Sequence, residues 1–232
     1  MKPNVETLTV IIFKSIAALR CYFESFLYSF SLCHAGAGLK VREHVKVSGS
    51  KNIWLGKKCY IGRNVELDAS SGELRIGNNV EIRDNVRIYA KKIVIGDSVT
   101  IGEGSFLNGS MEISTGAWIS RGCDLTGLIR IGRAILGPRT AIISGDHRRN
   151  PQTGEILMSG DGNGGRVAIE DGAWTGYGTI LLKGVTVGKN AIVGAGAIVI
   201  HDGVEIRDFA RLYAKDINIG SDLTVAEGCV RL

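Results

Sequence analysis

The sequence predicts an all-β fold, a parallel β-helix of hexapeptide repeats, preceded by an amphipathic α-helix. Aliphatic residues recur at every sixth position over most of the chain, and a glycine often follows, as in Ile95-Gly96. Glycine usage also divides the chain, because residues 1–35 contain none and all 32 glycines lie from Gly36 onward. We therefore expect a helical segment over residues 1–35 and a β-helix domain over residues 36–232.

The apolar residues of the N-terminal segment follow a helical spacing between residues 5 and 32. Lys14, Arg20 and Glu24 interrupt this stripe, which argues against a membrane-spanning helix and a cleaved signal peptide. Two alternatives stay open. The helix packs on the β-helix domain, or it lies on a membrane surface, because aromatic residues crowd the stripe and a basic patch follows over residues 39–58.

The hexapeptide period is the main evidence for the β-helix. One repeat supplies a short strand and a turn, which is too little to bury its own aliphatic residue. Stacked coils bury these residues in columns, each worth about 1.5–3 kcal/mol when fully buried. Glycine after the aliphatic residue suits a corner where a side chain would be crowded. The longest unbroken run is Ile95, Ile101, Leu107, Ile113, Ile119, Leu125 and Ile131.

The cysteines and histidines argue against a disulfide framework and against a metal site. Five cysteines are scattered without a CxxC pair, which favours a reducing compartment. Cys59, Cys123 and Cys229 take the small inward position of the repeat, so we expect them in the core. The four histidines lack the spacing of a metal-binding set, so no metal is expected.

The C-terminal part repeats an earlier part of the chain. Residues Val204–Gly228 closely match Val80–Gly104, which predicts that the coil continues to the C-terminus.

The period breaks once, over about residues 144–166 (SGDHRRNPQTGEILMSGDGNGGR). This insertion is polar, rich in glycine and much longer than a corner requires. A loop of about 20 residues in a compact domain is usually functional or disordered. His147 stands near the beginning of this loop, so we expect it to have a functional role.

The segment IGRAILGPRTAIISGDH, the loop and the segment VAIEDGAWTGYGTILLKGVTVGKNAIVGAGAIV follow one another in this order. This arrangement resembles the hexapeptide-repeat acyltransferases, and the similarity covers residues 39–200. The resemblance implies a left-handed triangular β-helix with three hexapeptides per coil, assembled as a homotrimer. It also implies an active site in the cleft between adjacent subunits, to which the interrupting loop contributes.

The resemblance further assigns catalytic and cofactor-binding residues. His147 matches the general base, which takes the proton of a sugar hydroxyl as that hydroxyl attacks the thioester of acetyl-CoA. The backbone N–H of Tyr177 matches the oxyanion donor. Trp174 matches a residue lining the acyl or cofactor cleft; the less favoured alternative is a large residue that covers a coil edge. The glycine-rich positions expected to contact acetyl-CoA are Gly176, Gly178, Gly194, Ala195 and Gly196.

The acceptor-binding residues are less well defined by the pattern. Arg148 and Arg149 contact a phosphate on the acceptor or are solvated. The position of a family asparagine beside the acceptor sugar is matched by Gly122 or Asp124, and Asp124 is the candidate contact. Either Asp146 or Glu155 orients the imidazole, or both are solvated.

Two departures from the family pattern affect the cofactor site. Residues 200–203 replace a threonine-lysine pair and a double-proline turn that help hold the nucleotide end of CoA. Thr175 replaces an aliphatic residue.

The resemblance as a whole implies an acetyl-CoA-dependent O-acetyltransferase that acts on a sugar or glycan intermediate of polysaccharide assembly. We expect a homotrimer in the cytoplasm, with peripheral contact to the inner face of the membrane through residues 5–32. The alternative is a trimeric scaffold whose cofactor site has decayed. No nucleic-acid partner is expected, because no recognition motif accompanies the basic patch.

Overall fold

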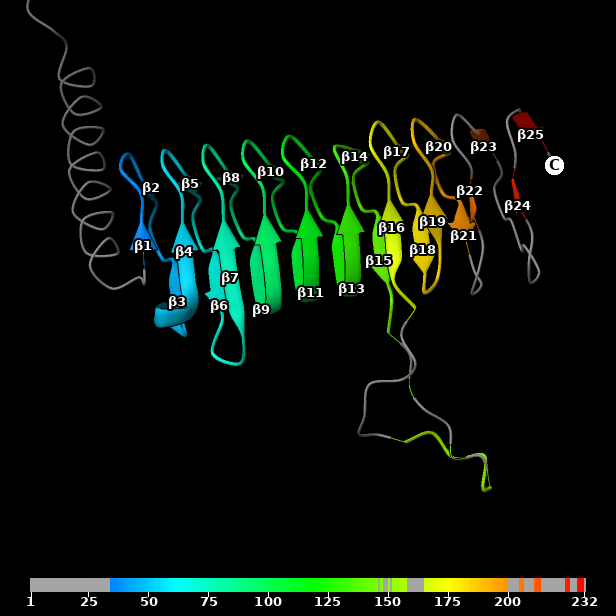
Figure 1. Cartoon of the computed structure of the whole chain (residues 1–232), viewed down its shortest axis with the longest axis horizontal. Coiled ribbons are helices and arrows are strands. Elements are labelled where there is room, and N and C mark those ends of the chain that lie inside the picture. The colour runs from blue at the N-terminus through cyan, green and yellow to red at the C-terminus, as the bar shows by residue number, and fades with distance from the viewer. Residues whose placement is uncertain are drawn as a thin grey trace, which may run out of the picture.

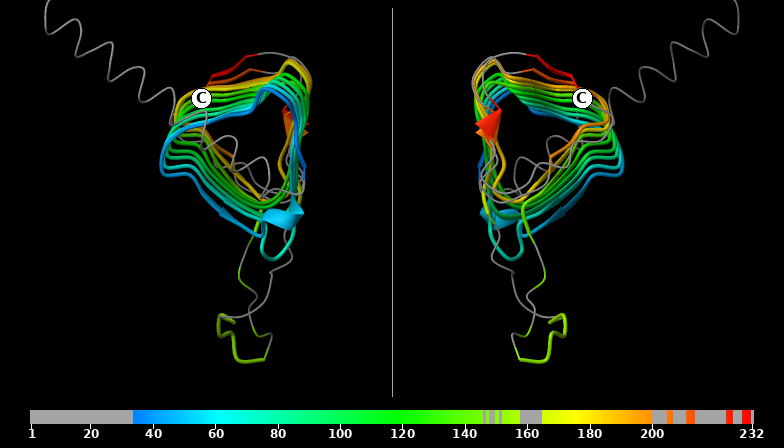
Figure 2. Two further views of the ribbon diagram at one scale, coloured as in Figure 1. Left: turned by 90° about the vertical axis from the view of Figure 1, so that its left-hand side faces the viewer. Right: turned by 90° about the vertical axis from the view of Figure 1, so that its right-hand side faces the viewer.

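The computed structural model describes residues 34–145, 147, 150, 152–157 and 165–199, and the backbone of four further strands between residues 205 and 231. The described chain winds into a parallel β-helix. Its coils stack along one long axis (Figure 1), and its outline along that axis is triangular (Figure 2). The predicted all-β parallel architecture is confirmed. The helix predicted over residues 5–32 lies outside the described residues.

The strands form three faces. One face is a separate ten-stranded sheet, and the other two join into a 15-stranded sheet because β9, β11 and β13 continue around a corner. The ten-stranded sheet consists of β2 (Lys40–Val41), β5 (Tyr60–Ile61), β8 (Glu81–Ile82), β10 (Thr100–Ile101), β12 (Trp118–Ile119), β14 (Ile135–Leu136), β17 (Trp174–Thr175), β20 (Ile192–Val193), β23 (Arg211–Tyr213) and β25 (Cys229–Arg231).

The two joined faces are named here after β6 and β7. The β6 face consists of β3 (Lys46–Ser48), β6 (Glu66–Asp68), the first halves of β9 (Arg87–Ile95), β11 (Phe106–Ile113) and β13 (Asp124–Ile131), then β15 (Ala141–Ile143), β18 (Ile180–Leu182) and β21 (Ile198–Val199). The β7 face consists of β1 (His34–Ala35), β4 (Ile53–Leu55), β7 (Glu73–Ile76), the second halves of β9, β11 and β13, then β16 (Val167–Ile169), β19 (Thr186–Val187), β22 (Glu205–Ile206) and β24 (Thr224–Val225).

Three corners connect the faces, and the chain passes them in the same order in every coil. Corner 1 leads from the β7 face into the ten-stranded sheet, and corner 2 leads from that sheet to the β6 face. Corner 3 leads from the β6 face to the β7 face, and there the coil carries its extra residues. These include the short 3-10 helix η1 (Ser50–Asn52), the turn at residues 69–72 and the long insertion at residues 144–166.

The pairing register measures the length of each coil. Thr100 pairs with Trp118, a step of 18 residues that equals three hexapeptides. Ile135 pairs with Trp174, a step of 39 residues that includes the insertion. Ile129 still pairs with Val167 beyond the insertion, so the coil resumes in register.

The aliphatic residues of the repeat fill the interior, as predicted. Ile101, Leu107, Leu125 and Ile131 are fully buried, and the whole run from Ile95 to Ile131 lies in the core. Cys59 and Cys123 are buried free thiols, which confirms the prediction for these two cysteines. The side chain of Cys229 lies outside the described residues.

The glycine after the aliphatic residue is explained by the stacking of the coils. A Cβ atom on Gly62 would lie 2.6 Å from the backbone carbon of Arg83 in the next coil. Because a backbone atom cannot move away as a flexible side chain can, this corner position requires glycine. The sequence-based expectation of a crowded corner is therefore confirmed.

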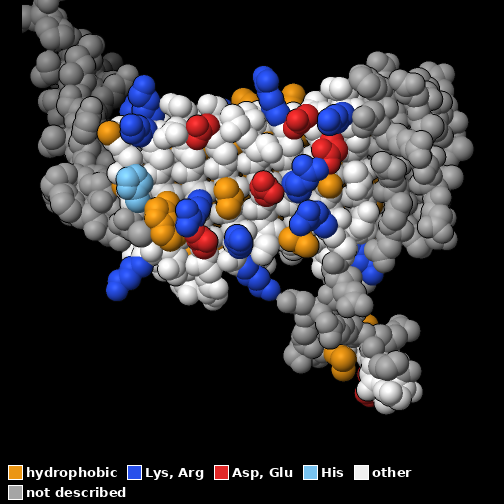
Figure 3. Space-filling model, in the orientation of Figure 1, with side chains coloured by type: hydrophobic (Ala, Val, Ile, Leu, Met, Phe, Trp, Pro, Cys, Tyr) orange, Lys and Arg blue, Asp and Glu red, His pale blue; other side chains and the backbone are white. Residues whose placement is uncertain are grey.

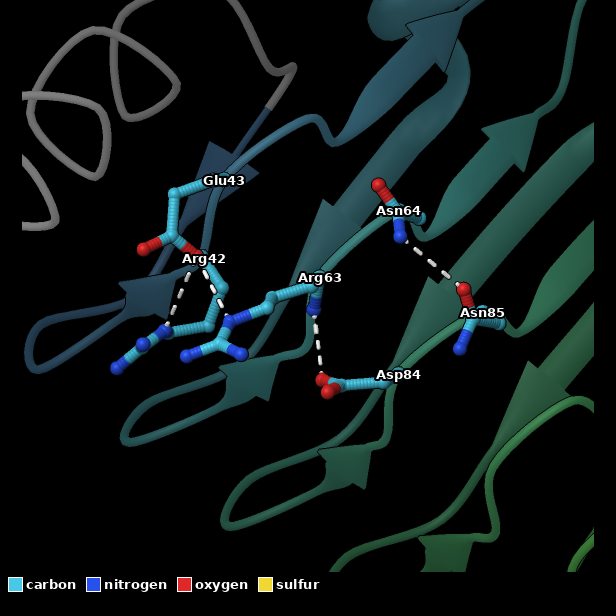
Figure 4. Close-up of polar contacts among 6 residues, drawn as sticks. All are labelled: Arg42, Glu43, Arg63, Asn64, Asp84 and Asn85. Carbon is cyan, nitrogen blue, oxygen red and sulfur yellow. Dashed lines mark hydrogen bonds and ion pairs between the residues drawn. The ribbon is translucent and has the colours of Figure 1, made fainter.

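Side chains of successive coils cap corner 2 near the N-terminal end. Figure 4 shows this stack, in which the backbone N–H of Arg63 donates to Asp84 Oδ1 at 2.8 Å. The amide of Asn64 donates to Asn85 Oδ1 at 3.1 Å, and Arg63 forms an ion pair with Glu43 at 3.1 Å. Asn64 and Asn85 both have a positive φ, a conformation that asparagine tolerates better than most residues. Polar side chains thus hold these first corners together.

The C-terminal strands continue the coil. Ile192 pairs with Arg211 and Arg211 pairs with Cys229, while Glu205 pairs with Thr224 on the β7 face. The backbone pairing confirms that the duplicated segment forms further coils.

Candidate functional site

The insertion leaves the coil at corner 3, where β15 ends at Ile143, and returns at Val167 of β16. Its described part projects away from the coil (Figures 1 and 2). His147 is solvent-exposed near the beginning of this insertion. Arg148 and Arg149 lie outside the described residues, as does Asp146.

The outer part of the insertion contains a compact turn between Asn150 and Glu155. The N–H of Asn150 donates to the carbonyl of Glu155 at 2.8 Å, and the N–H of Gly154 donates to the carbonyl of Asn150 at 2.9 Å. The hydroxyl of Thr153 donates to Glu155 Oε2 at 3.1 Å. This contact uses one carboxylate oxygen of Glu155, a residue predicted to orient the base or bind the acceptor. The turn is followed by two exposed apolar residues, Ile156 and Leu157.

Trp174 belongs to an apolar row on the outer surface of the ten-stranded sheet. Trp118 pairs with Ile135, and Ile135 pairs with Trp174, so the three side chains follow one another on successive coils. All three are exposed, and Trp174 has 48% of its surface accessible. We call Trp118, Ile135 and Trp174 the apolar row. It lies on the coils that flank the insertion.

Tyr177 stands at corner 2, directly after the strand that carries Trp174. Its ring is half exposed, and the guanidinium carbon of Arg139 lies 5.8 Å from the ring centroid. Gly176 before it is buried, and Gly178 after it has a positive φ of 68°. A Cβ atom on Gly176 would collide with the backbone of Ala195 in the next coil. Gly176 is therefore required by the corner itself, whereas Gly178 takes a positive φ that Arg139 also adopts at the same place one coil earlier.

The backbone N–H of Tyr177 has no hydrogen-bond acceptor among the described residues. The N–H of Arg63, at the equivalent place in an earlier coil, donates to the Asp84 carboxylate of the coil above it. Ala195 occupies the position above Tyr177 and carries no acceptor. The backbone N–H groups of Glu103 and Arg121 also have no hydrogen-bond acceptor among the described residues, so an open N–H is common along the later part of corner 2.

Gly194, Ala195 and Gly196 form corner 2 one coil beyond Tyr177. The N–H of Gly176 donates to the carbonyl of Val193 at 2.7 Å, and the N–H of Gly196 donates to the carbonyl of Tyr177 at 2.8 Å. Ala195 is exposed, and Gly196 has a positive φ of 71°. The two glycine-rich turns thus form one backbone surface with few side chains.

Buried threonines lie beneath corner 2, and sequence reasoning missed this feature. Thr140, Thr175 and Thr179 are fully buried. The Oγ1 atoms of Thr140 and Thr175 lie 2.9 Å apart, and Thr175 Oγ1 accepts the N–H of Gly137 at 3.1 Å. The polar residue that interrupts the aliphatic pattern at position 175 is therefore part of a hydrogen-bonded group. That interruption was the available signal in the sequence.

Asp124 begins β13 on the β6 face, next to corner 2. It is exposed, and its Oδ1 accepts the hydroxyl of Thr126 at 3.0 Å. Asp124 pairs with Ala141, and Ala141 pairs with Ile180, the residue after Thr179. Asp124 therefore lies two coils from the corner that carries Tyr177, or about 10 Å along the axis at the usual strand spacing.

The structure brings some predicted site residues together and separates others. Trp174, Tyr177 and the glycine-rich turns around Ala195 share one end of the ten-stranded sheet and corner 2. His147 and Glu155 belong to the insertion at corner 3. The β6 face lies between the two corners, so one chain presents the two groups at different edges of the triangle (Figure 2).

A shallow pocket of about 350 Å³ lies on the β7 face beside the base of the insertion. On this face, charged side chains of both signs alternate with hydrophobic ones (Figure 3). Arg130 of the pocket is ion-paired with Glu170. No sequence pattern indicated this pocket. Its lining residues are Lys92, Val94, Ser110, Met111, Glu112, Leu128, Ile129, Arg130 and Arg166.

Among the described residues, no three histidine, cysteine or acidic side chains cluster as a metal would require. No helix in the described part of the chain is long and apolar enough to cross a membrane.

The repeat, the triangular coil and the single long insertion define the class of protein as a hexapeptide-repeat solenoid. No family model matches the chain. The chain is 32% identical over 160 residues to the bifunctional protein GlmU of Carboxydothermus hydrogenoformans, a match covering 64% of this chain and 32% of that protein. It is 31% identical over 159 residues to GlmU of Thermotoga maritima, covering 62% and 33%. The chain thus spans about a third of the length of these relatives.

Solved structures with a similar coil include an N-acyltransferase, AntD from Bacillus cereus, in complex with dTDP-4-amino-4,6-dideoxyglucose and coenzyme A. It has a TM-score of 0.46 and 18% identity, covering 81% of this chain and 82% of that one. PerB from Caulobacter crescentus, in complex with CoA and GDP-perosamine, has a TM-score of 0.35 and 20% identity, covering 75% and 53%. The sequence matches to GlmU proteins and the hexapeptide coil support a relationship to the hexapeptide-repeat acyltransferases.

Proposed function

We propose that the protein is an acetyl-CoA-dependent O-acetyltransferase that modifies a hydroxyl of a sugar or glycan intermediate. His147 removes the proton of the acceptor hydroxyl, and the hydroxyl oxygen attacks the thioester carbonyl carbon. The Tyr177 N–H stabilises the resulting oxyanion, and collapse of the intermediate expels the CoA thiolate, which takes up the proton. The observation that carries this proposal is an unoccupied Tyr177 N–H beside a nearly bare backbone surface.

The proposed active site requires two copies of the chain. His147 and the Tyr177 corner lie at different edges of one coil, so a loop from one copy has to reach corner 2 of its neighbour. Such a head-to-tail contact closes into a ring when the rotation fits, here as a homotrimer. The exposed Ile156 and Leu157 of the insertion and the apolar row are surfaces of matching chemistry for this contact. The left-handed sense of the coil belongs to the same proposal.

Acetyl-CoA is proposed to lie along corner 2. The turns formed by Gly176 and Gly178 and by Gly194, Ala195 and Gly196 carry few side chains, which leaves room for the pantetheine arm beside the open N–H of Tyr177. Trp174 provides an exposed apolar surface at the beginning of this corner. Residues 200–203 fall outside the described residues, so the nucleotide end of CoA is not assigned.

The acceptor is proposed to bind near the base of the insertion. Asp124, Arg148, Arg149 and Glu155 remain the candidate contacts. The pocket on the β7 face lies next to corner 3, where the insertion returns to the coil. Its Lys92 and Arg166 favour an acceptor that carries negative charge, such as a phosphate-linked sugar. The domain boundary at residue 35, the cytoplasmic location and the membrane contact through residues 5–32 also remain proposals.

Thiol release tests the proposed function. Purified protein is incubated with acetyl-CoA and a panel of sugars and glycans, including amino sugars because an amine attacks a thioester in the same way. We expect acceptor-dependent release of CoA, with His147→Ala reducing kcat by roughly 10²–10⁴-fold. Lys189→Ala, an exposed residue outside the site, serves as the control.

Two results would overturn parts of this proposal. Equal rates for His147→Ala and the wild-type protein would remove His147 from the mechanism. Failure to bind acetyl-CoA in calorimetry would favour the alternative of a non-catalytic trimeric scaffold.

A further inference from the structure

One buried hydroxyl contacts two successive turns of corner 2. Thr179 is fully buried, and its Oγ1 lies 3.0 Å from the carbonyl oxygen of Gly176 and 3.2 Å from that of Gly194. A hydroxyl has one proton, so it donates to these two carbonyls in a shared or alternating way. Both carbonyls therefore point into the coil interior, where Thr179 lies.

The direction of these carbonyls fixes the direction of two N–H groups. The carbonyl of Gly176 and the N–H of Tyr177 belong to one peptide group, and none of the described peptide bonds is cis. In a trans peptide the C=O and N–H bonds point in opposite directions. Because the carbonyl of Gly176 points inward to Thr179, the Tyr177 N–H points out of the coil. By the same reasoning, the carbonyl of Gly194 points inward to Thr179 and the N–H of Ala195 points out of the coil.

The hydroxyl also strengthens the N–H as a donor. A hydrogen bond to the carbonyl of a peptide polarises that peptide and makes its N–H a better donor, an effect that is larger in a buried environment. Thr140 adds to this arrangement, since its Oγ1 lies 2.9 Å from the carbonyl of Gly137 and 3.5 Å from that of Gly176. In earlier coils the residues in line with Thr179 are Val65 and Val86, which lack a donor, and Ser105, Cys123 and Thr140, which carry one.

We propose that Thr179 is a positioning residue that aims and polarises the Tyr177 N–H for the tetrahedral oxyanion of acetyl transfer. This inference rests on the proposed function for its catalytic part, and on the hydrogen-bond geometry alone for the orientation of the N–H. Thr179 touches neither substrate nor cofactor and acts only through the Gly176–Tyr177 peptide.

The chain provides a matched control for this role. Ser105 takes the same place in an earlier coil, and its Oγ donates to the carbonyl of Ser120 at 3.1 Å. It is fully buried like Thr179, but it lies beneath a corner without a proposed ligand. Loss of either hydroxyl leaves a buried carbonyl with fewer partners, and loss of Ser105 Oγ also removes the acceptor of the Cys123 N–H at 3.1 Å. Ser105→Val therefore carries at least the structural cost of Thr179→Val.

The experiment compares Thr179→Val, Thr179→Ser and Ser105→Val in two measurements. In the acetyl-transfer assay, Thr179→Val is expected to lower kcat by roughly 10- to 100-fold with the KM for acetyl-CoA within about twofold. Thr179→Ser is expected to recover kcat to within about threefold, and Ser105→Val to leave kcat within about twofold. Equal losses in Thr179→Val and Ser105→Val would overturn the positioning role.

The second measurement does not depend on activity. In protein labelled with ¹⁵N-tyrosine, the Tyr177 amide signal is assigned with Tyr177→Phe. Thr179→Val is expected to shift this signal and speed its hydrogen exchange, whereas Ser105→Val leaves it unchanged. An unchanged signal in Thr179→Val would overturn the proposed orientation. If the wild-type protein transfers no acetyl group, the proposed function fails, and the amide signal still decides the orientation.

Discussion

The two corners that flank the ten-stranded sheet follow similar backbone paths but treat their outward N–H groups differently. At corner 1, side chains of the next coil accept hydrogen bonds from these N–H groups along much of the solenoid. The N–H of Lys57 donates to Asn78 Oδ1 at 2.8 Å, that of Asn78 to Asp97 Oδ1 at 2.6 Å, and that of Arg133 to Asp171 Oδ1 at 2.7 Å. At corner 2, Arg63 is capped in this way, whereas Tyr177 is not.

The difference shows how a repeat that is built for stability also provides a binding surface. A capped N–H strengthens the contact between coils but is no longer available to a ligand. An open N–H at an exposed corner still bonds to water and is available to a substrate oxygen. Because the side chain of Ala195 has no acceptor, the Tyr177 N–H stays open to water or to a substrate oxygen. Substitutions can test this difference by blocking the open N–H at corner 2, by removing an acceptor at corner 1, or by changing a buried side chain beneath corner 2.

The largest expected effect comes from closing corner 2. Ala195→Asn places an amide oxygen above Tyr177, as Asn78 does above Lys57, and so occupies the proposed oxyanion donor. Because loss of one such donor typically costs about 10²–10³-fold in kcat, we expect a loss of this size in the thiol-release assay.

Ala195→Leu is the matched control, since it fills a similar volume without an acceptor. It is expected to raise the KM for acetyl-CoA while retaining most of kcat. If Ala195→Asn and Ala195→Leu lower kcat equally, steric hindrance rather than capping explains the loss.

Opening corner 1 is expected to affect stability. Asp97→Ala removes the acceptor for the N–H of Asn78, and also a side-chain contact at 3.2 Å to Asn78 Nδ2. We expect the free energy of unfolding to fall by roughly 1–2 kcal/mol. Urea denaturation measures this change. Asp97→Asn keeps an acceptor and should lose less than half as much, and equal losses would show that charge rather than capping is responsible.

A smaller, pH-dependent effect is expected beneath corner 2. Burial raises the pKa of the Cys123 thiol to about 11. The unfolded chain, with a thiol pKa of about 8.5, releases this proton earlier. The stabilisation is therefore fully present below about pH 8.5 and is lost as the pH rises toward 11.

Cys123→Ser removes the titrating group while keeping a small donor beneath the corner. Its stability should fall less steeply than that of the wild-type protein between pH 8 and pH 10 in urea denaturation. Parallel curves for the two proteins would contradict the assignment of this pH dependence to Cys123.

The periodicity of the sequence was sufficient to predict the coil, because each aliphatic position depends only on its neighbours in adjacent coils. Ile101 and Leu125, for example, are buried as their spacing predicts. The role of Thr175 was not predictable in this way. Its polarity departs from the repeat, and only the fold brings its hydroxyl 2.9 Å from that of Thr140, 35 positions earlier in the chain.

The sequence proposes a set of site residues but does not predict their arrangement in space. The resemblance named both His147 and Tyr177, yet hexapeptide spacing contains no information about which corner carries an insertion. The structure assigns the two residues to corner 3 and corner 2. The pocket lined by Arg166 was also missed, because its other lining residues come from three strands, β9, β11 and β13, and many of them face outward, where the core pattern does not specify them.

The central claim is that the active site combines His147 of one copy with the Tyr177 corner of another. His147→Ala and Ala195→Asn each impair a different half of this site, so each variant alone should be nearly inactive. When the two variants are unfolded together, refolded as mixed trimers and assayed, about a quarter of the sites regain both intact halves. We predict recovery to about a quarter of wild-type activity. Activity no greater than that of the separate variants would contradict an active site shared between copies.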